Sequence, residues 1–522
     1  MLNMKKQLLI ILFAVITIGT FSQTVTTYNM ENAGLSVDRI ASISDINGDI
    51  WIGEGKGISK FDGNTWTNYS WDEMNAPWDW IWIHEAIEDT DGNIWVCGEA
   101  GLWKFDGNDW TYYGEGTPEL SAGYMFMDMV LDEEGVLWIL GGNTVESWLY
   151  SLELSTMTFT LFDYINYPEL DNDCWKIDIN SEGKIILASD DVGFLEFDGT
   201  TFITHEAVTC FGFDFDENEN IWSGGRYPIQ GLYHYDNEFN ELAEFDIYNS
   251  LIPFDWISYM KYNSQEDYQS IWFSGEQEAY NHKGVGVYED AKDLFIHFDE
   301  TTGLITNQIR SFFFRENEAW MGTQDYGVMK LDFTNSALIS ADSSIIWVDI
   351  QMGDTQTIPV NILNKGGGTL SYIVNTSASS SWLSTNDNGG NAAGYGLNTH
   401  EFIFDASNYN SPGTYETTFT VESNGGKMFI TAIMDVSDIT GNKEIEGLGF
   451  TVYPNPANDI LNVNLKNLPE SIRILSSTGQ CVDIINNISY SNTIDISHLA
   501  LGSYMLETIL DGQRQHVKFQ KL

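Results

Sequence analysis

Aromatic side chains next to carboxylates, amides and one arginine are the residues of this sequence best suited to binding a ligand. Aromatic rings provide apolar surface for a sugar ring or an exposed peptide, and a few polar neighbours fix its orientation. We expect a ligand surface formed by Trp78, Trp80, Trp82, Tyr124, Asp173, Trp175, Trp256, Asn307 and Arg310. The alternative is that these residues are buried between sheets. Trp80 and Trp82 share one strand face, so burial alone could explain that pair.

The histidines and carboxylates form no catalytic motif. Eight histidines are scattered along the chain, and none belongs to an HExxH or H-x-H pair. The G-x-S-x-G elbow and the P-loop are also absent from the sequence. With 76 acidic residues, closely spaced carboxylates say little about glycosidase chemistry. We therefore expect no catalytic residue and no enzyme, with a polysaccharide lyase or glycoside hydrolase as the alternative.

Acidic turns are the candidates for a bound cation. Residues 89–93 and 214–218 offer several hard oxygen atoms, which are the ligands that Ca²⁺ prefers. Neither turn fits the EF-hand pattern, and one such turn recurs in each repeat, which favours a role in hairpins. The four cysteines are far apart and include no CxxC pair that would indicate zinc. We expect no metal and no cofactor, with Ca²⁺ at the acidic turns as the alternative.

These residues are distributed over a sequence repeat of about 45 residues. The segments GDIWIG (48–53) and GISKFDGNTW (57–66) return as GNIW (92–95) and GLWKFDGNDW (101–110). Weaker copies centre on Trp138, Ile186, Trp222, Trp272 and Trp320. Each copy has the pattern of four antiparallel strands with Asn-Gly or Asp-Gly turns. Seven copies predict an all-β protein that begins with a seven-bladed β-propeller, in which the recurrent Trp packs between blades.

The two ends of the repeat region indicate how the ring closes. The seventh copy stops after residues 329–332, without a fourth strand. Residues 25–28 before Gly34 correspond to residues 294–297 before Gly303, the outer strand that precedes copy seven. We therefore expect the leading strand to complete the last blade, which removes its open edge. The aromatic segments above would then lie in the connections into each inner strand, at one mouth of the central channel.

The repeats resemble the two-component regulator propeller repeat, whose pattern is roughly D-x-x-G-x-x-W-hydrophobic-G followed by G-L and F-D-G. The resemblance covers about residues 24–335 and is strongest in the first two copies. In that family the repeats often form sensory ectodomains of membrane-spanning histidine kinases. The sequence contains no kinase or response-regulator module. The resemblance therefore implies the fold and a binding role, and it does not imply signalling.

Two smaller β modules follow the repeats. Residues 336–440 contain alternating strands separated by turns rich in Ser, Asn and Gly, which suits an immunoglobulin-like sandwich. The stretch 388–391 together with 381–384 and 413–415 is similar to carbohydrate-associated sandwich modules of secreted bacterial proteins. Such a module acts either as a spacer or as a binder.

The last module, residues 441–522, resembles the C-terminal sorting domain of the type IX secretion system. The resemblance rests on Tyr453, Pro454, Asn455, Pro456, Gly502, Tyr504, Lys518 and Lys521, in the expected order. It implies export across the outer membrane, followed by release or attachment at the cell surface. The secretion machinery is then a partner, and the module acts as a sorting signal with no catalytic role.

The first 22 residues have the pattern of a signal peptide. Lys5 and Lys6 precede an apolar run from Leu8 to Ile18, and a cut is expected before Gln23. The run is too short to span a bilayer, so we expect no transmembrane segment.

The 522 residues carry a formal charge of −53, which disfavours nucleic acid as a partner. The expected domains are 1–22, 23–335, 336–440 and 441–522.

The sequence therefore predicts an exported monomer, outside the cell or on the outer-membrane surface after transit through the periplasm. Its propeller would bind an extracellular glycan or protein. A propeller-type polysaccharide lyase or hydrolase and a structural adhesin are the alternatives. Converging Asp, Glu, His or Tyr side chains in the channel would favour an enzyme, and an aromatic-rich mouth would favour binding.

Overall fold

The computed structural model describes residues 25–521 with short gaps. The gaps are 79–80, 121–124, 143–145, 190–191, 209–211, 227–228, 277–280, 377–379, 438–449, 454–456, 458–459, 470, 477–480, 486–487, 500–501 and 511–512. The predicted signal peptide, residues 1–22, lies outside the described residues. No helix in the described part of the chain is long and apolar enough to cross a membrane. Strands dominate, with two short 3₁₀ helices, η1 (Pro168–Leu170) and η2 (Asp290–Lys292), which confirms the all-β class.

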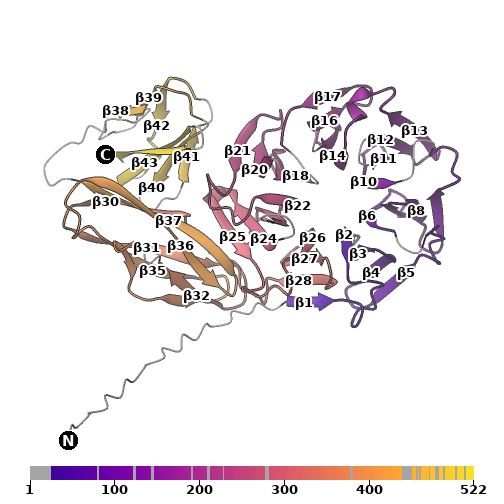
Figure 1. Cartoon of the computed structure of the whole chain (residues 1–522), viewed down its shortest axis with the longest axis horizontal. Helices are drawn as coiled ribbons and strands as arrows, with labels where there is room; N and C mark the ends of the chain where they lie inside the picture. Colours follow the sequence, from indigo (N-terminus) through magenta and orange to yellow (C-terminus); the bar gives the residue numbers. More distant parts are fainter. Residues whose placement is uncertain are drawn as a thin grey trace, which may run out of the picture.

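Among the described residues, the chain up to Asp332 forms seven antiparallel units of four strands, arranged around one centre (Figure 1). In chain order the strands of the first four units are β2 (Ile40–Ile46), β3 (Asp49–Glu54), β4 (Gly57–Phe61), β5 (Trp66–Ser70); β6 (Ile83–Glu88), β7 (Ile94–Gly98), β8 (Gly101–Phe105), β9 (Trp110–Gly114); β10 (Phe126–Leu131), β11 (Val136–Gly142), β12 (Ser147–Glu153), β13 (Thr158–Asp163); β14 (Cys174–Ile179), β15 (Ile185–Ser189), β16 (Gly193–Phe197) and β17 (Phe202–His205). The last three units contain β18 (Phe213–Phe215), β19 (Ile221–Arg226), β20 (Ile229–Tyr235), β21 (Glu241–Phe245); β22 (Trp256–Asn263), β23 (Ser270–Glu276), β24 (His282–Glu289), β25 (Leu294–Phe298); and β26 (Ile309–Arg315), β27 (Glu318–Thr323), β28 (Val328–Asp332) with β1 (Val25–Tyr28).

The leading strand closes the ring, as the sequence predicted. β1 pairs antiparallel with β28, with Val25 opposite Leu331 and Tyr28 opposite Val328. The Tyr28 ring stacks on Trp320 at 5.6 Å and also lies 5.4 Å from Phe61 in the first sheet. The strand therefore joins the seventh sheet to the first and leaves no open edge on β28.

The recurrent tryptophans occupy the seams between neighbouring sheets. Trp51, Trp95, Trp222, Trp272 and Trp320 are each at most 3% exposed. Ring contacts cross from one sheet to the next, as between Trp51 and Phe105 (6.3 Å) or Trp272 and Phe314 (5.3 Å). Because large aromatic side chains bury most apolar area per residue, the same position repeated in each unit supplies much of the core.

The next module consists of two facing sheets. One sheet contains β29 (Ile339–Ala341), β31 (Thr355–Asn364), β35 (Leu397–Asp405) and β33 (Leu383–Thr385). The other contains β30 (Ile345–Gln351), β37 (Gly426–Ser437), β36 (Gly413–Ser423), β32 (Leu370–Asn375) and β34 (Gly389–Ala392), with β30 parallel to β37. The alternating burial along β36 and β37 is typical of strands with one face on a core.

This sandwich is joined to the sixth propeller sheet rather than separated from it. β25 pairs with β37 through Ile296 opposite Met428 and His297 opposite Lys427, so one sheet runs from the propeller into the sandwich. Lys427 forms an ion pair with Asp299 at 2.8 Å. Buried side chains of both parts form one continuous apolar cluster. A propeller cut off near residue 335 would expose that cluster to water.

The C-terminal module also has two sheets. One contains β38 (Phe450–Tyr453), β39 (Ile460–Leu465) and β42 (Ser491–Asp495). The other contains β41 (Cys481–Ile485), β40 (Ser471–Ser476), β43 (Gly502–Leu510) and β44 (Gln513–Lys521). It contacts the sandwich through the ion pair between Lys518 and Asp349 (2.7 Å) and through Trp347, which packs in a small cluster with Leu475 and Met505.

Candidate functional site

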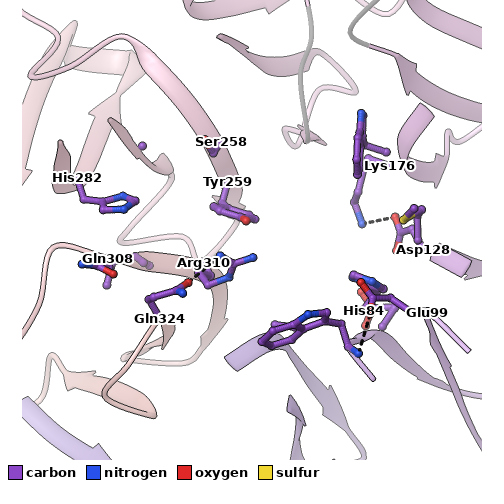
Figure 2. A pocket seen from close by; sticks show the side chains of 17 residues that line it. His84, Glu99, Asp128, Lys176, Ser258, Tyr259, His282, Gln308, Arg310 and Gln324 are labelled. Carbon is purple, nitrogen blue, oxygen red and sulfur yellow. Dashed lines mark hydrogen bonds and ion pairs between the residues drawn. The ribbon is translucent and has the colours of Figure 1, made fainter. Parts of the chain in front are cut away.

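A cavity of about 500 Å³ lies where the inner strands of the propeller converge. Side chains from several sheets point into it from opposite sides (Figure 2). The lining residues are Ala41, Trp82, His84, Glu85, Glu99, Met127, Asp128, Trp175, Lys176, Ser258, Tyr259, Gly275, His282, Gln308, Ile309, Arg310 and Gln324. A volume of this size suits a small molecule or one end of a chain rather than a folded surface.

A β-bulge near the start of six inner strands aims one extra residue at this cavity. The register skips one residue where each of these strands pairs with its neighbour, for example between Ile83 and Glu85 and between Ile309 and Ser311. The skipped residues are Ala41, His84, Met127, Trp175, Ser258 and Arg310. All six line the cavity. A bulge leaves its extra residue out of the pairing and redirects that side chain, so the fold presents six variable positions at one place.

Glycines at the end of the second strand let the mouth segments approach closely. A side chain at Gly98 would lie 2.3 Å from the backbone oxygen of Trp82, and one at Gly275 would collide with the backbone oxygen of Trp256. The backbone N–H of Glu99 donates to that same Trp82 oxygen at 3.1 Å. The glycine after the recurrent Trp of the repeat therefore positions the segment that carries Trp82.

One wall of the cavity is a network of opposite charges. Lys176 forms an ion pair with Asp128 at 2.8 Å, and the backbone N–H of Ile177 donates to the same carboxylate at 3.0 Å. Burial lowers the pKa of Lys176, but Asp128 and Glu85 more than offset this effect and the pKa is raised. Burial raises the pKa of Glu85, whose carboxylate accepts a hydrogen bond from Ser44 at 2.6 Å. Lys176 and Glu85 also line a second cavity of about 450 Å³, so the two cavities meet at this network.

Polar groups without partners lie on both sides of the cavity, with Arg310 opposite the charged network and His84 on the same side as Asp128 (Figure 2). Arg310 donates to the Gln324 side chain at 2.8 Å and lies over the Tyr259 ring at 5.4 Å, but its Nε has no hydrogen-bond partner. The Nε2 atom of His84 is likewise buried without a partner. Burial lowers the pKa of His84 to about 4, so the imidazole is neutral at pH 7. A ligand with hydrogen-bonding groups would satisfy atoms that the protein leaves open.

The structure brings together some of the predicted ligand residues and separates others. Trp82, Trp175 and Arg310 line the cavity, and Trp80 and Tyr124 lie outside the described residues. Trp78, Asp173, Trp256 and Asn307 are not among the residues that line it. Trp78 is 47% exposed, and the Asn307 side chain accepts a hydrogen bond from the backbone N–H of Glu300 at 3.0 Å. Asn307 thus shapes its own loop.

Most polar residues of the cavity were missed from the sequence. They are His84, Glu85, Glu99, Asp128, Lys176, Ser258, Tyr259, His282, Gln308 and Gln324. His84 and Ser258 occupy the same repeat position as Trp175 and Arg310, so aligning the copies at that position would have found them. Glu99 and Gln324 follow the second strand of their sheets, and no spacing pattern in the sequence marks them.

The acidic turns act within their own hairpins. The Asp89 carboxylate accepts hydrogen bonds from the backbone N–H of Asn93 (2.9 Å) and from Trp95 Nε1 (2.8 Å), which fixes both the turn and the seam tryptophan. Asp216 likewise accepts from the backbone N–H of Asn220 at 2.9 Å. Within the residues that the structure describes, no group of three or more His, Cys, Asp or Glu side chains could hold a metal ion.

The predicted sorting residues lie on the C-terminal sheets where they are described. Tyr453 ends β38 and is 48% exposed, whereas Pro454, Asn455 and Pro456 lie outside the described residues. Gly502 begins β43, and the buried Tyr504 stacks on Phe519 at 5.7 Å. Lys518 lies over the Trp347 ring at 5.5 Å, and Lys521 is buried at the end of β44.

Residues 451–521 match the family model of the secretion system C-terminal sorting domain. This match identifies the C-terminal module as a type IX sorting domain and places the protein outside the cell or at its surface. No curated protein matches the chain.

Similar solved structures include extracellular bacterial domains. One is from a protein described as the hybrid two component system BT3049 of B. thetaiotaomicron, with 15% identity, coverage of 92% of this chain and 72% of that chain, and a TM-score of 0.27. Another is from a protein described as the one component system BT4673 of the same organism, with 13% identity, coverage of 93% and 86%, and a TM-score of 0.30. At such scores the matches carry no functional inference, and the propeller fold rests on the sheet order itself.

Proposed function

We propose that this exported protein binds an extracellular glycan in the central cavity of its propeller. The observation that carries the proposal is the joint placement of Trp82, Trp175 and Tyr259 with the open polar groups of His84 and Arg310 around one cavity. Aromatic faces accept a sugar ring, and the polar groups select its substituents. A cavity of about 500 Å³ accommodates a short saccharide better than the surface of a folded protein partner.

The test is a glycan array with the full chain from residue 23, followed by calorimetry on each glycan retained. Replacing a cavity aromatic, Trp175→Ala, should weaken binding about tenfold, equivalent to about 1.4 kcal/mol. Trp78→Ala is the matched control, since Trp78 is not among the cavity-lining residues. Circular dichroism checks that both variants fold. If no glycan binds, or if both variants lose affinity equally while folded, the proposal is wrong.

Export has a separate test. Deleting residues 441–522 should leave the chain in the periplasm, because the matched sorting domain is lost. A periplasmic fluorescent protein that carries residues 441–522 should appear at the surface or in the medium. Normal surface appearance of the truncated chain would contradict the role of this module.

A propeller-type polysaccharide lyase or hydrolase is the second candidate. Titratable side chains do converge on the cavity, and the neutral imidazole of His84 has an open Nε2 atom suited to accept a proton. Binding is preferred because the carboxylates of Glu85 and Asp128 are already engaged by Ser44 and Lys176. Prolonged incubation of the bound glycans should therefore give no new reducing ends and no unsaturated products. Products that disappear in His84→Ala would establish the enzyme instead.

A further inference from the structure

Two arginines of this strongly acidic chain lack an acidic partner. The structure describes the side chains of four arginines. Arg315 lies 3.4 Å from Asp45 and 3.6 Å from Glu318, and Arg473 lies 3.5 Å from Asp293. Among the described residues, Arg39 forms no hydrogen bond or ion pair, and Arg310 donates only to the neutral Gln324 amide. With 76 acidic residues available, this exception needs a physical reason.

Arg310 lines the cavity, and Arg39 stacks on a residue that lines it. The Arg39 guanidinium stacks over the Trp82 ring at 4.2 Å, and the Arg310 guanidinium lies over the Tyr259 ring at 5.4 Å. Trp82, Tyr259 and Arg310 all line the cavity, and Arg39, which directly precedes β2, is close enough for the charge of Arg310 to lower its pKa. Figure 2 shows Arg310 extended into that space. The Nε atoms of both side chains are buried and have no hydrogen-bond partner.

This arrangement is unfavourable as long as no anion lies near the two guanidinium groups. Burial lowers the pKa of Arg39, and the charge of Arg310 lowers it further. Like charges repel, and a half-buried cation without an anionic partner loses part of its hydration without compensation. Stacking on Trp82 recovers part of this loss.

Nearby protein carboxylates do not complete the pair. Glu99 and Asp325 are close enough to raise the pKa of Arg39, yet no ion pair joins either of them to Arg39 in the described part of the chain. Burial raises the pKa of Glu99 itself. The missing anion must therefore come from the ligand if it is to sit between the two guanidinium groups.

We propose that the glycan bound by this protein is acidic, and that its carboxylate lies between Arg39 and Arg310 while its ring contacts Trp82 and Tyr259. The inference rests on the proposed function and narrows it to sugars such as uronic acids. A planar carboxylate matches the paired donors of a guanidinium group, and each such contact is charge-assisted. A sulfated sugar would supply an anion too, but without that planar match.

The experiment compares a uronic-acid oligosaccharide with the same oligosaccharide after chemical reduction of its carboxyl groups. Calorimetry with the full chain from residue 23 should show binding of the acidic form and at least tenfold weaker binding of the reduced form. Arg310→Gln and Arg39→Gln should each weaken binding of the acidic form by about tenfold to a hundredfold. Arg315→Gln is the matched control, because Arg315 already has acidic partners, and it should bind like the parent.

Thermal unfolding without ligand gives an independent readout. Arg39→Gln should raise the melting temperature of the empty protein, since it removes an unpaired charge, whereas an arginine with a structural role would lower it. A lower melting temperature of Arg39→Gln would overturn the assignment of Arg39 to the ligand.

The outcomes separate this inference from the proposed function. Equal binding of acidic and reduced oligosaccharides, or full affinity in both arginine variants, contradicts the acidic-sugar proposal and leaves glycan binding intact. Preference for a sulfated oligosaccharide over the uronic acid also contradicts it. Capture of an acidic peptide with no glycan bound overturns both proposals.

Discussion

The same strands build the seams between sheets and the central cavity. The positions in the seams repeat one residue type, whereas the positions that face the cavity vary. In the seams one residue type recurs, as Trp51, Trp95 and Trp320 show. At the bulges that face the cavity, the equivalent residues are Ala41, His84, Met127, Trp175, Ser258 and Arg310. A ring of similar sheets needs similar seams, whereas its centre is free to vary. The varied side chains at the cavity can therefore determine which ligand the protein binds.

The recurrent tryptophans and the polar cavity residues also differ in their hydrogen bonding. In the second and third sheets the recurrent Trp donates to a turn carboxylate, as Trp95 does to Asp89 and Trp138 to Asp132, each at 2.8 Å. In the cavity His84 and Arg310 keep buried atoms without partners. Unsatisfied buried groups lower stability, and in the cavity a ligand that supplies the missing partners would offset this cost.

Deleting residues 25–28 should give the largest loss of stability. The deletion exposes the edge of β28 and removes Tyr28 from between Trp320 and Phe61. We expect the free energy of unfolding to fall by more than about 3 kcal/mol in urea titrations, because the packing of the half-buried Tyr28 and the pairing of β28 are lost together. Tyr28→Phe is the control and should unfold like the parent. An unchanged midpoint after the deletion would show that the ring does not depend on this strand.

The contrast between seam and cavity can be measured with two tryptophans. Trp320→Ala, in a fully buried seam, should lower the free energy of unfolding by about 3–5 kcal/mol. Trp175→Ala, in the cavity wall, should lower it by less than about 1.5 kcal/mol, because the half-buried ring faces open space. Equal losses in urea titrations would remove the distinction between the two regions.

Carboxylates of the two regions should respond to pH with opposite signs. Burial raises the pKa of Asp89, but hydrogen bonds from Trp95 and Asn93 outweigh it and the pKa is lowered. The ionised Asp89 carboxylate therefore stabilises the fold above the pKa that Asp89 has in the unfolded chain, about 4. This stabilisation is lost as the pH falls through the lower pKa that Asp89 has in the folded protein. Asp89→Ala should cost about 1–3 kcal/mol at pH 7 and less in acid.

Glu99 in the cavity provides the opposite case. Burial raises its pKa, so ionisation above the unfolded value of about 4.3 destabilises the folded protein. Glu99→Gln should raise the melting temperature at pH 7 and leave it unchanged in acid, where Glu99 is already protonated. A loss of stability at pH 7 would mean that the ionised carboxylate is stabilised by the cavity. Thermal scans from pH 3 to pH 7 measure both variants.

The smallest effect is expected at a bulge. Ser258→Ala should change the free energy of unfolding by no more than about 0.5 kcal/mol, because the residue stands outside the strand pairing and faces the cavity. Ser274→Ala, on the neighbouring strand, should cost about 1 kcal/mol, since the buried Ser274 hydroxyl donates to the Ile309 backbone at 3.0 Å. Urea titrations in which Ser258→Ala costs more than Ser274→Ala would contradict the assignment of roles.

The repeated features of the molecule could be predicted from the sequence. The tryptophan period, the Asp-Gly turns and the match between residues 25–28 and 294–297 each reflect a local rule that all copies obey. The sorting module was identified from its own motif and is confirmed by the family match. Trp82, Trp175 and Arg310 were assigned to the ligand surface because their segments lead into inner strands, and the structure places them at the cavity.

The remaining features depend on contacts between distant segments. The bulge that aims His84 inward is a one-residue shift of register that no residue type marks, although His84 shares its repeat position with Trp175 and Arg310. The junction of propeller and sandwich rests on two residue pairs, Ile296 with Met428 and His297 with Lys427, which carry no motif. The absence of a partner for Arg39 is visible only once its surroundings are assembled.

A crystal structure of the full chain from residue 23 with its tightest uronic-acid oligosaccharide tests the central claim most directly. We predict that the sugar occupies the central cavity, with its carboxylate between Arg39 and Arg310 and its ring against Trp82. A sugar bound to the sandwich or to the outer edge of the propeller, with the cavity empty, would contradict the account.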